Sequence, residues 1–391
     1  MKGFLHLLRV ELAEIRHDFR RPAFLFGAAL AYLLVFGMLY IPNIVTAVPT
    51  VILDEDNSAL SRQLVRDFEA SDSYQVTAYV TSQEEMLAAL HDQTAIAAID
   101  IPHDFAKKAR NGSYSTVLYL TNGANIILTN ITSAAAQSIT EDFSNHLAAQ
   151  QVALRFGLNE EKVAHYIAPV VVHLRVLYNA TQGYMFFFLI GLAMVAFQQG
   201  ILFAVGASSF YEVEHPETMQ GYGVAEIMLA KTTVYWLLAM CSYLLILLGI
   251  TQGLGIDLHA PLGQLLLLAA LFILAVIGFC FFFTSFFPAE LPFVRAVILY
   301  PVPCFIFSGY TWPIESMGPN MQLAAQFFPL THFSNTVRDL FLIGSCADYT
   351  LCLEKLCGLM LLFFLVGGLL YRRNLTRRRQ AMAACHAADS L

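Results

Sequence analysis

Six long apolar stretches run through this chain, and each is close to the roughly 20 residues that a helix needs to cross a bilayer. Apolar and polar residues do not alternate inside them, which disfavours the strands of a membrane β-barrel. The pattern therefore predicts a polytopic membrane protein with a helical transmembrane region. The six predicted transmembrane helices cover residues 23–41, 184–205, 232–250, 262–287, 291–311 and 353–371.

The long segment 42–182, between the first two predicted spans, has a different pattern. Strand-like runs alternate there with helix-like runs, which is typical of an α/β domain. The fold class that follows is membrane α-helical, with six transmembrane helices and an inserted extracytoplasmic α/β domain. Predicted strands cover 50–53, 75–80, 95–101, 115–120 and 170–178, and predicted helices cover 58–70, 124–156 and 160–167, with shorter ones after Ser82 and Pro102.

Basic residues at the two ends of the chain predict its orientation, because Lys and Arg are in excess on the cytoplasmic side of a membrane. Both ends are therefore expected in the cytoplasm, and the domain at 42–182 on the opposite side. That domain has 15 acidic and 8 basic residues, a net charge of −7, so no nucleic-acid partner is expected. The two clusters are Lys2, Arg9, Arg16, Arg20 and Arg21, and, in the cytoplasmic tail 372–391, Arg372, Arg373, Arg377, Arg378 and Arg379.

An amphipathic helix is predicted over residues 4–20, because its larger apolar residues fall on one face. Pro22 interrupts that helix before the first span. Segment 1–22 is therefore predicted to lie in the cytoplasmic membrane interface. A plain cytoplasmic extension of the first span is the alternative. The apolar face consists of Leu5, Leu8, Leu12, Ile15 and Phe19.

Shorter segments join the later spans. Residues 207–231 are expected to form an acidic cytoplasmic loop, and Pro301 and Pro303 predict a kink in the fifth span. The outer segment 312–352 is too apolar for a free loop. Two short amphipathic helices, at 321–328 and 333–343, are therefore expected at the outer membrane face.

Composition adds two points to this picture. Charged residues are 13% of the chain and apolar residues 57%, whereas soluble domains have about 25% charged residues. None of the seven cysteines lies in segment 42–182. Cys346 and Cys352 are close together near the predicted outer face, where either a disulfide or two free thiols would be compatible with an oxidising compartment.

Motifs for catalysis are missing from the sequence. It contains no Gly-x4-Gly-Lys-Ser/Thr loop for ATP phosphates, no His-Glu-x-x-His, no Gly-x-Ser-x-Gly and no Cys-x-x-Cys. We therefore predict no catalytic, cofactor-binding or metal-ligating residue, and the chain is not expected to be an enzyme.

Three segments carry a family signature. Residues 305–344 include Phe-Ser-Gly-Tyr at 307–310, Pro-Ile-Glu-Ser-Met at 313–317, Pro-Leu-Thr-His at 329–332 and Arg338. Tyr178-Asn179 stands before the second span. The third segment holds Tyr211-Glu212-Val213-Glu214-His215 and continues to Glu226-Ile227 and Lys231. Together they resemble the membrane permeases of ABC-2-type exporters, in the branch with a large extracytoplasmic domain after the first span. Phe210-Tyr211 and Pro216-Glu217 depart from the usual Arg and Gly-Thr of that family.

The resemblance implies the permease subunit of an ATP-driven exporter in the bacterial inner membrane, which moves a hydrophobic or amphipathic substrate. ATP and Mg²⁺ would bind to a separate ABC ATPase subunit, and this chain would bind no cofactor. The other expected partners are the lipid bilayer and a second permease copy or a paralogue. A periplasmic adaptor protein is a further candidate.

Two sets of candidate residues follow. The surfaces that an ATPase would grip are helix 4–20 and loop 207–231, although that loop is also compatible with simple solvation. The residues of the pathway or gating set either carry polar side chains or shape the backbone near the spans. For Arg295 the alternative is that its side chain reaches the cytoplasmic membrane interface, and for the two glutamines the alternative is helix packing. The coupling residues are Arg9, Arg16, Glu212, Glu214, His215, Glu217 and Glu226. The pathway or gating residues are Asn179, Gln198, Gln199, Arg295, Ser308, Gly309, Pro313 and Glu315.

A membrane-anchored sensor with a ligand-binding outer domain is the main alternative function. It would need a cytoplasmic output domain, and the two tails are only about 20 residues long. An intramembrane enzyme would need ionisable residues within the spans, and only Arg295 qualifies. Copurification with an ATP-hydrolysing protein would favour the permease, and its absence would favour the sensor.

Overall fold

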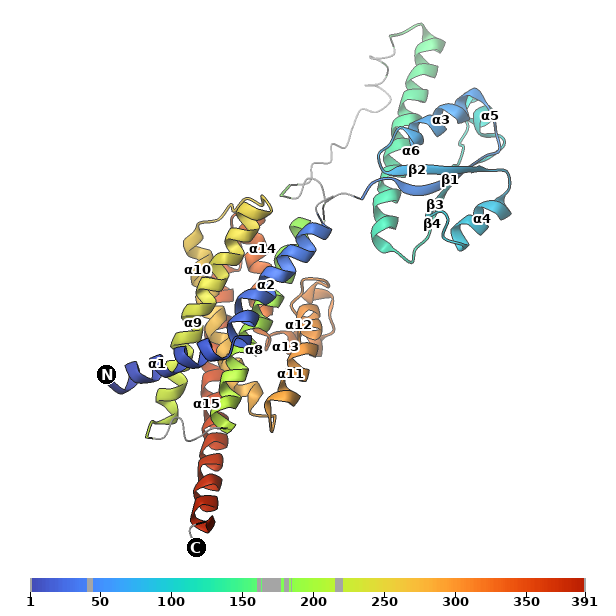
Figure 1. The fold of residues 1–391 in the computed structure, drawn as a ribbon. Coiled ribbons are helices and arrows are strands. Elements are labelled where there is room, and N and C mark those ends of the chain that lie inside the picture. Colours follow the sequence, from blue (N-terminus) through green and yellow to red (C-terminus); the bar gives the residue numbers. More distant parts are fainter. Residues whose placement is uncertain are drawn as a thin grey trace. The chain divides into compact units, whose positions relative to one another are not determined.

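The computed structural model describes residues 2–40, 45–159, 163, 177–178, 183, 185–214 and 221–389. The chain divides into two units, which we call the membrane unit (residues 1–43 and 176–391) and the α/β unit (residues 44–175). Figure 1 shows the membrane unit as a bundle of long helices and the α/β unit as a small sheet with helices on its faces.

Six helical segments of the described residues are long and apolar enough to cross a membrane, which confirms the predicted number. The first is α2 (Arg20–Leu39), and the second joins the π-helical turn Met185–Leu189 to α8 (Ile190–Glu214). The third and fourth are α9 (Val224–Leu248), extended by a π-helical turn to Gly253, and α10 (Leu262–Thr284). The last two are α11 (Glu290–Leu299) with α12 (Pro301–Phe307), and α15 (Tyr349–Asp389).

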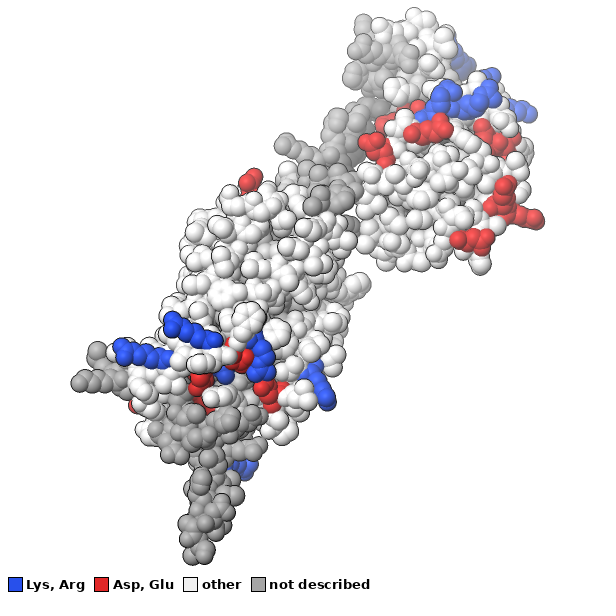
Figure 2. All heavy atoms as spheres, in the orientation of Figure 1, with Lys and Arg blue, Asp and Glu red and all other residues white. Residues whose placement is uncertain are grey.

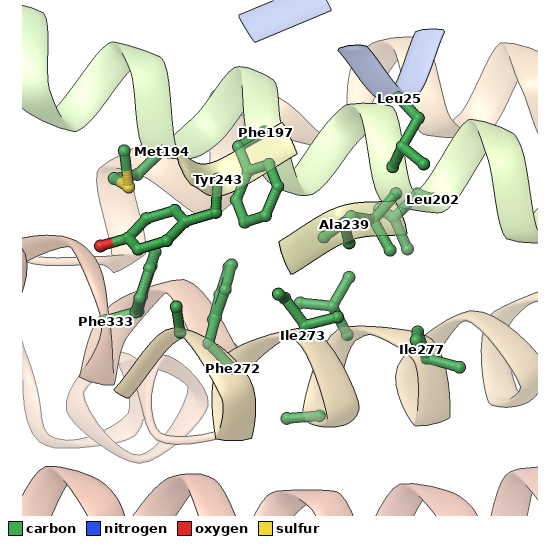
Figure 3. Close-up of a cluster of buried hydrophobic side chains, with 14 of the residues drawn as sticks. Leu25, Met194, Phe197, Leu202, Ala239, Tyr243, Phe272, Ile273, Ile277 and Phe333 are labelled. Atoms are coloured by element: carbon green, nitrogen blue, oxygen red, sulfur yellow. The ribbon is translucent and has the colours of Figure 1, made fainter. Parts of the chain in front are cut away.

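The core of the membrane unit forms around α8. Buried residues make up 83% of its most apolar stretch, compared with 22% for α2 and for α11 with α12. Figure 3 shows Phe197 of α8 beside Tyr243 of α9 and Phe272 of α10. The Phe272 ring stacks on Phe333 with centroids 3.8 Å apart. Helix α8 is therefore held on several sides by apolar side chains, whereas α2 and α11 keep large apolar surfaces uncovered.

The N-terminal helix α1 (Lys2–His17) buries only part of the apolar face that the sequence predicts. Ile15 of that face is buried together with Leu7 and Glu11, which lie beside the face, whereas Leu5 and Leu12 stay exposed. The reason is electrostatic: Glu11 meets a buried lysine of α9, and this contact turns the charged residue inward.

The predicted boundaries around the loop 207–231 and in the fifth span also change. Helix α8 continues to Glu214 and α9 already begins at Val224, so the connection is much shorter than predicted. Glu226 accepts a hydrogen bond from the backbone N–H of Gly223 at 3.3 Å, and this contact helps to start α9 early. The fifth span divides at Tyr300, directly before Pro301, as the prolines predict.

Two helices stand between α12 and α15, close to the positions predicted for them, and each is preceded by a 3₁₀ turn. In chain order, the segments are the 3₁₀ turn Ile314–Ser316, α13 (Pro319–Ala325), the 3₁₀ turn Pro329–His332 and α14 (Ser334–Leu342). Val337, Leu340 and Phe341 of α14 are fully buried, so this segment belongs to the core of the membrane unit rather than to a loose loop.

The α/β unit contains a four-stranded sheet in the order β2-β1-β3-β4. Strand β1 pairs in parallel with β2 and β3, and β3 pairs antiparallel with β4. Ser58 caps α3 as predicted, because its hydroxyl accepts from the backbone N–H groups of Leu60 and Ser61. The strands are β1 (Val48–Asp54), β2 (Tyr74–Val80), β3 (Ala97–Ile101) and β4 (Leu118–Thr121), and the helices are α3 (Ala59–Glu69), α4 (Gln83–His91), α5 (Phe105–Arg110) and α6 (Ile126–Phe156).

Two apolar clusters cover the two faces of this sheet. On one face, Ile52 and Ile99 pack with Phe68 of α3 and Phe143 of α6. On the other face, Leu53 and Val80 pack with Met86 of α4. The predicted helix at 160–167 and strand at 170–178 lie almost entirely outside the described residues.

Candidate functional site

A group of buried charges joins four helices of the membrane unit. Glu11 lies on α1, Arg21 on α2, Glu212 on α8 and Lys231 on α9, and none of them is more than 2% exposed. We call these four residues the buried ion cluster. Burying one charge without a partner is very costly. The two acidic and two basic residues therefore offset the cost of one another's burial.

Lys231 is the centre of the cluster. Its Nζ atom lies 3.0 Å from Oε2 of Glu11 and 3.0 Å from Oε1 of Glu212. The ammonium also donates to the hydroxyl of Ser208 and, at 3.2 Å, to the backbone carbonyl of that residue. One side chain of α9 is thereby attached to α1 and α8.

Two hydroxyl groups complete the partners of the carboxylates. Ser208 of α8 donates to Glu11, and Tyr371 of α15 donates to Glu212. The contact made by Tyr371 adds the last span to the assembly. Helices α1, α8, α9 and α15 therefore meet through polar contacts in a region that water does not reach.

Arg21 fixes the turn between α1 and α2. Its Nη1 atom lies 3.3 Å from Glu14 and 3.8 Å from Glu11, and its Nε atom lies 3.3 Å from Asp18. The guanidinium also lies over the ring of Tyr211 in α8, 5.5 Å from its centroid. These contacts hold α1 at a set angle to the first span.

The two glutamates of α1 are in opposite electrostatic situations. Burial alone would raise the pKa of Glu11, but the Lys231 ammonium and the hydrogen bond from Ser208 outweigh it and hold the pKa below the ordinary 4.5. Partial burial and the negative charge of Glu11 raise the pKa of Glu14. The ionised form is therefore favoured at position 11 and disfavoured at position 14.

Exchanging these glutamates for glutamine should separate their roles. Glu11→Gln is expected to cost roughly 3 kcal/mol of unfolding free energy, because Lys231 loses a buried partner. Glu14→Gln should change it by less than about 1 kcal/mol, because the charge it removes is unfavourable overall. Thermal unfolding of the full chain in nanodiscs, followed by tryptophan fluorescence, measures both.

The same pair has a pH signature. Since the folded-state pKa of Glu11 lies below 4.5, its stabilisation is complete above that pH and is lost as the pH falls further. The midpoint of unfolding should therefore drop less on acidification in Glu11→Gln than in the parent chain. An equal acid response of the two proteins would show that Glu11 is not held ionised by the cluster.

A second polar group, which we call the tyrosine–arginine cluster, lies at the start of α8. The hydroxyl of Tyr310 accepts from the backbone N–H of Gly191 at 3.1 Å and donates to the carbonyl of Phe187. The guanidinium of Arg338 in α14 lies 5.2 Å from the ring centroid of Tyr310 and 5.5 Å from that of Phe187. Tyr310 thus satisfies backbone groups of the π-helical turn, where the regular hydrogen-bond ladder changes.

The residues before Tyr310 form the turn that presents it. Gly309 has φ +78°, and a Cβ atom there would lie 2.6 Å from the Ile314 side chain, so only glycine fits without strain. The carbonyl of Ser308 accepts from the amide of Asn335 in α14 at 2.9 Å. The Ser-Gly-Tyr run therefore ties the end of α12 to both α8 and α14.

A family model described as "ABC-2 family transporter protein" matches residues 22–371. The chain belongs to this family. It is 20% identical over 347 residues to the probable multidrug ABC transporter permease YbhR of Escherichia coli K12, covering 88% of this chain and 90% of that protein. It is 32% identical over 87 residues to nodulation protein J of Neorhizobium galegae, covering 22% and 32% of the two chains. Over 124 residues it is 27% identical to the permease YbhS of E. coli K12, covering 31% and 32%.

Family membership makes this ABC-2 protein a multi-pass membrane permease of an ABC transporter system with an ATPase partner. Its expected coupling residues fall into two groups. Arg9, Arg16 and Glu226 are exposed, whereas Glu212 is buried in the ion cluster and can act only through its neighbours. Glu214 ends α8, and His215 and Glu217 lie outside the described residues.

The expected pathway or gating residues that the structure describes lie in different surroundings. Gln198 is buried in α8 and donates to Sγ of Cys304 in α12 at 3.4 Å, whereas Gln199 is half-buried. Ser308 and Gly309 belong to the turn beside the tyrosine–arginine cluster. Asn179 lies outside the described residues, and the exposed members of the set are Arg295, Pro313 and Glu315.

Sequence reasoning does not single out Glu11, Arg21, Ser208 and Tyr371 as a site, and it places Lys231 at the end of a loop. One signal was available in the sequence of this ABC-2 permease. Lys231 directly precedes an uncharged span, where a lone charge requires a partner or access to water. The partner could not be identified, because Glu11 precedes Lys231 by 220 positions.

Proposed function

We propose that this chain is the membrane-spanning subunit of an ATP-driven exporter that moves a hydrophobic or amphipathic substrate across the bacterial inner membrane. A separate ABC ATPase would bind ATP and Mg²⁺. Two facts support the proposal: the sequence has no ATP-phosphate loop, and a relative that aligns along most of the chain is named a probable multidrug ABC transporter permease. The apolar spans are compatible with such a substrate.

The observation that carries the proposed mechanism is the attachment of α1 to the spans through Lys231. Arg9 and Arg16 of α1 and Glu226 of α9 are exposed, so an ATPase can reach them. A displacement of α1 would pull on Lys231 through Glu11, and on Glu212 and Tyr371 behind it. The buried ion cluster would thus transmit movement from the ATPase contact to α8, α9 and α15.

The proposed position of α1 is the cytoplasmic membrane interface. Its exposed apolar residues Leu5 and Leu12 would face lipid, and the exposed Arg9 and Arg16 would lie beside them at headgroup level. Figure 2 shows that charged residues on this side of the membrane unit gather around α1 and leave an uncharged surface over the neighbouring spans. The two ends of the chain would then be cytoplasmic.

At the opposite end of α8, the tyrosine–arginine cluster would act as the outer gate, and the α/β unit would lie outside the cytoplasm. A second permease copy or a paralogue would complete the transporter, and a periplasmic adaptor could contact the outer side. Substituted cysteines test the orientation in a background whose seven native cysteines are replaced by serine: Tyr114→Cys should react with an impermeant maleimide in intact cells, whereas Arg9→Cys should not.

Affinity purification provides the test of the function itself. The tagged permease, purified from its own host, should carry an ABC ATPase whose activity falls when the permease is removed. A purified complex without any ATP-hydrolysing chain, together with unchanged substrate efflux in a deletion strain, would overturn the proposal.

Glu226 offers a direct probe of the ATPase contact. Glu226→Gln keeps an oxygen that can accept from Gly223 but removes the charge, so folding should be retained while transport falls about fivefold, the equivalent of about 1 kcal/mol at an interface. Glu354→Gln, an exposed glutamate at the other end of the membrane unit, is the matched control and should transport normally. Efflux from cells and ATPase activity of the purified complex measure the effect.

A further inference from the structure

A large cleft opens in the α/β unit, among residues that belong to neither of the two polar clusters described above. It has a volume of about 960 Å³ and lies between α6 and the segment 112–119, with residues of α3 and α5 also lining it. Small-molecule sites usually occupy about 300–1,000 Å³. The cleft is therefore large enough for a ligand of two or three rings.

The floor of the cleft is apolar and built into the core. Leu64, Phe105, Ala136 and Phe143 line it, and all four belong to the buried cluster on that face of the sheet. The rings of Phe105 and Phe143 lie 6.0 Å apart. Because these side chains are held by packing, the floor is preformed and suits an apolar ring.

The walls of the cleft are polar but almost uncharged. They carry hydroxyl and amide groups from α6, including Gln137, Thr140 and Ser144, and from the facing segment. Glu141 is the only ionisable acid or base among the Asp, Glu, Lys, Arg and His side chains that line the cleft in the described residues. An anionic ligand would find no cationic partner here, and the net charge of −7 on the surrounding sequence would repel it, while the exposed carboxylate of Glu141 gives a cation no buried partner.

One buried hydroxyl at the cleft lacks a partner, and the aromatic residue beside it is uncovered. The hydroxyl of Ser115 is buried and has no hydrogen-bond partner in the described part of the chain. Buried polar groups are nearly always paired, and an unpaired one costs about 1–3 kcal/mol. Tyr114, next to it, is 86% exposed. Its ring is therefore accessible for stacking against a ligand.

We propose that this cleft binds an uncharged amphiphile that carries hydroxyl groups on an apolar ring system, which is the chemistry of a glycoside. The apolar floor takes the ring system, Tyr114 stacks against an exposed ring face, and Ser115 and the α6 amide and hydroxyl groups bind the ligand hydroxyls. This inference is independent of the proposed transport function, because binding requires neither ATP nor a partner chain.

The test uses the full chain in nanodiscs and two fluorescent probes with the same aromatic ring. 4-Methylumbelliferyl glucoside presents an uncharged hydroxyl-rich head, and 4-methylumbelliferyl phosphate presents an anionic one. Equilibrium dialysis against empty nanodiscs removes the contribution of the bilayer. The glucoside should bind saturably, and the phosphate should bind at least about tenfold more weakly, since the cleft offers no cation.

Variants then locate the binding site. Tyr114→Ala and Gln137→Ala should each weaken glucoside binding about fivefold or more, the loss expected for one stacking or hydrogen-bonding contact. Tyr79→Ala, which removes an exposed tyrosine of the same unit that does not line this cleft, should bind like the parent chain. Equal binding of the two probes, or glucoside binding unaffected by both cleft variants, would overturn the proposal.

Discussion

Replacing Lys231 by methionine is expected to destabilise the membrane unit strongly. Methionine has a similar length and no charge, so the carboxylates of Glu11 and Glu212 would remain buried without their shared cation. Breaking a buried ion pair costs about 3–5 kcal/mol. The midpoint of thermal unfolding in nanodiscs should fall accordingly, or the chain should fail to purify as a single species.

A triple variant distinguishes charge from packing. Combining Lys231→Met with Glu11→Gln and Glu212→Gln removes every charge of this part of the cluster, and much of the lost stability should return because no carboxylate is left unpaired. Lys355→Met, at an exposed position of α15, is the control for loss of a lysine. If Lys231→Met alone is as stable as the parent chain, the cluster does not hold these helices together.

The triple variant also tests transmission. If the ion cluster only stabilises the fold, the triple variant should transport normally. If it also carries movement from α1 to the spans, the variant should keep its fold and its ATPase partner but lose efflux. Measuring bound ATPase and transport on the same preparation separates the two outcomes.

The second large effect is expected at Gly200, where α8 touches the backbone of α2. A Cβ atom there would lie 2.6 Å from the carbonyl oxygen of Phe24, and a backbone atom cannot move aside as a side-chain tip can. Gly200→Ala should therefore separate the two helices and cost about 1–3 kcal/mol, as overpacking does elsewhere. Thermal unfolding and the yield of detergent-stable protein report this loss.

Gly27 provides the matched control on the other helix. An added Cβ atom there meets nothing within 4 Å, so Gly27→Ala should be neutral or slightly stabilising, because alanine is the better helix former. If Gly200→Ala behaves like Gly27→Ala, the close approach of α2 and α8 is not required for stability.

Sequence reasoning predicts the large features of this fold because they depend on length and local pattern. The six spans follow from apolar runs, and the strands of the α/β unit follow from alternating segments with turn residues between them. The proline at position 301 also locates the break in the fifth span, since proline lacks the donor that a continuous helix needs.

Long-range pairing explains what sequence reasoning does not predict. Periodicity treats every charged residue as a surface residue, so it leaves Glu11 off the packed side of α1 and extends the 207–231 loop over the start of α9. Only the partner of Glu11, far along the chain, reverses that assignment. Likewise, Tyr310 and Arg338 belong to segments that resemble the family. Their contact with each other and with Phe187 could not be predicted, because the three residues come from three separate segments.

The distance along the chain between Glu11 and Lys231 has a consequence for biogenesis. The N-terminal helix leaves the ribosome well before α9, and at about 5–20 residues per second the intervening 220 positions take roughly 10–40 seconds to synthesise. During this interval the carboxylate of Glu11 cannot be buried with its cation, so this carboxylate must stay in contact with water. Nascent chains that stop before the third span would therefore keep Glu11 without its buried cation.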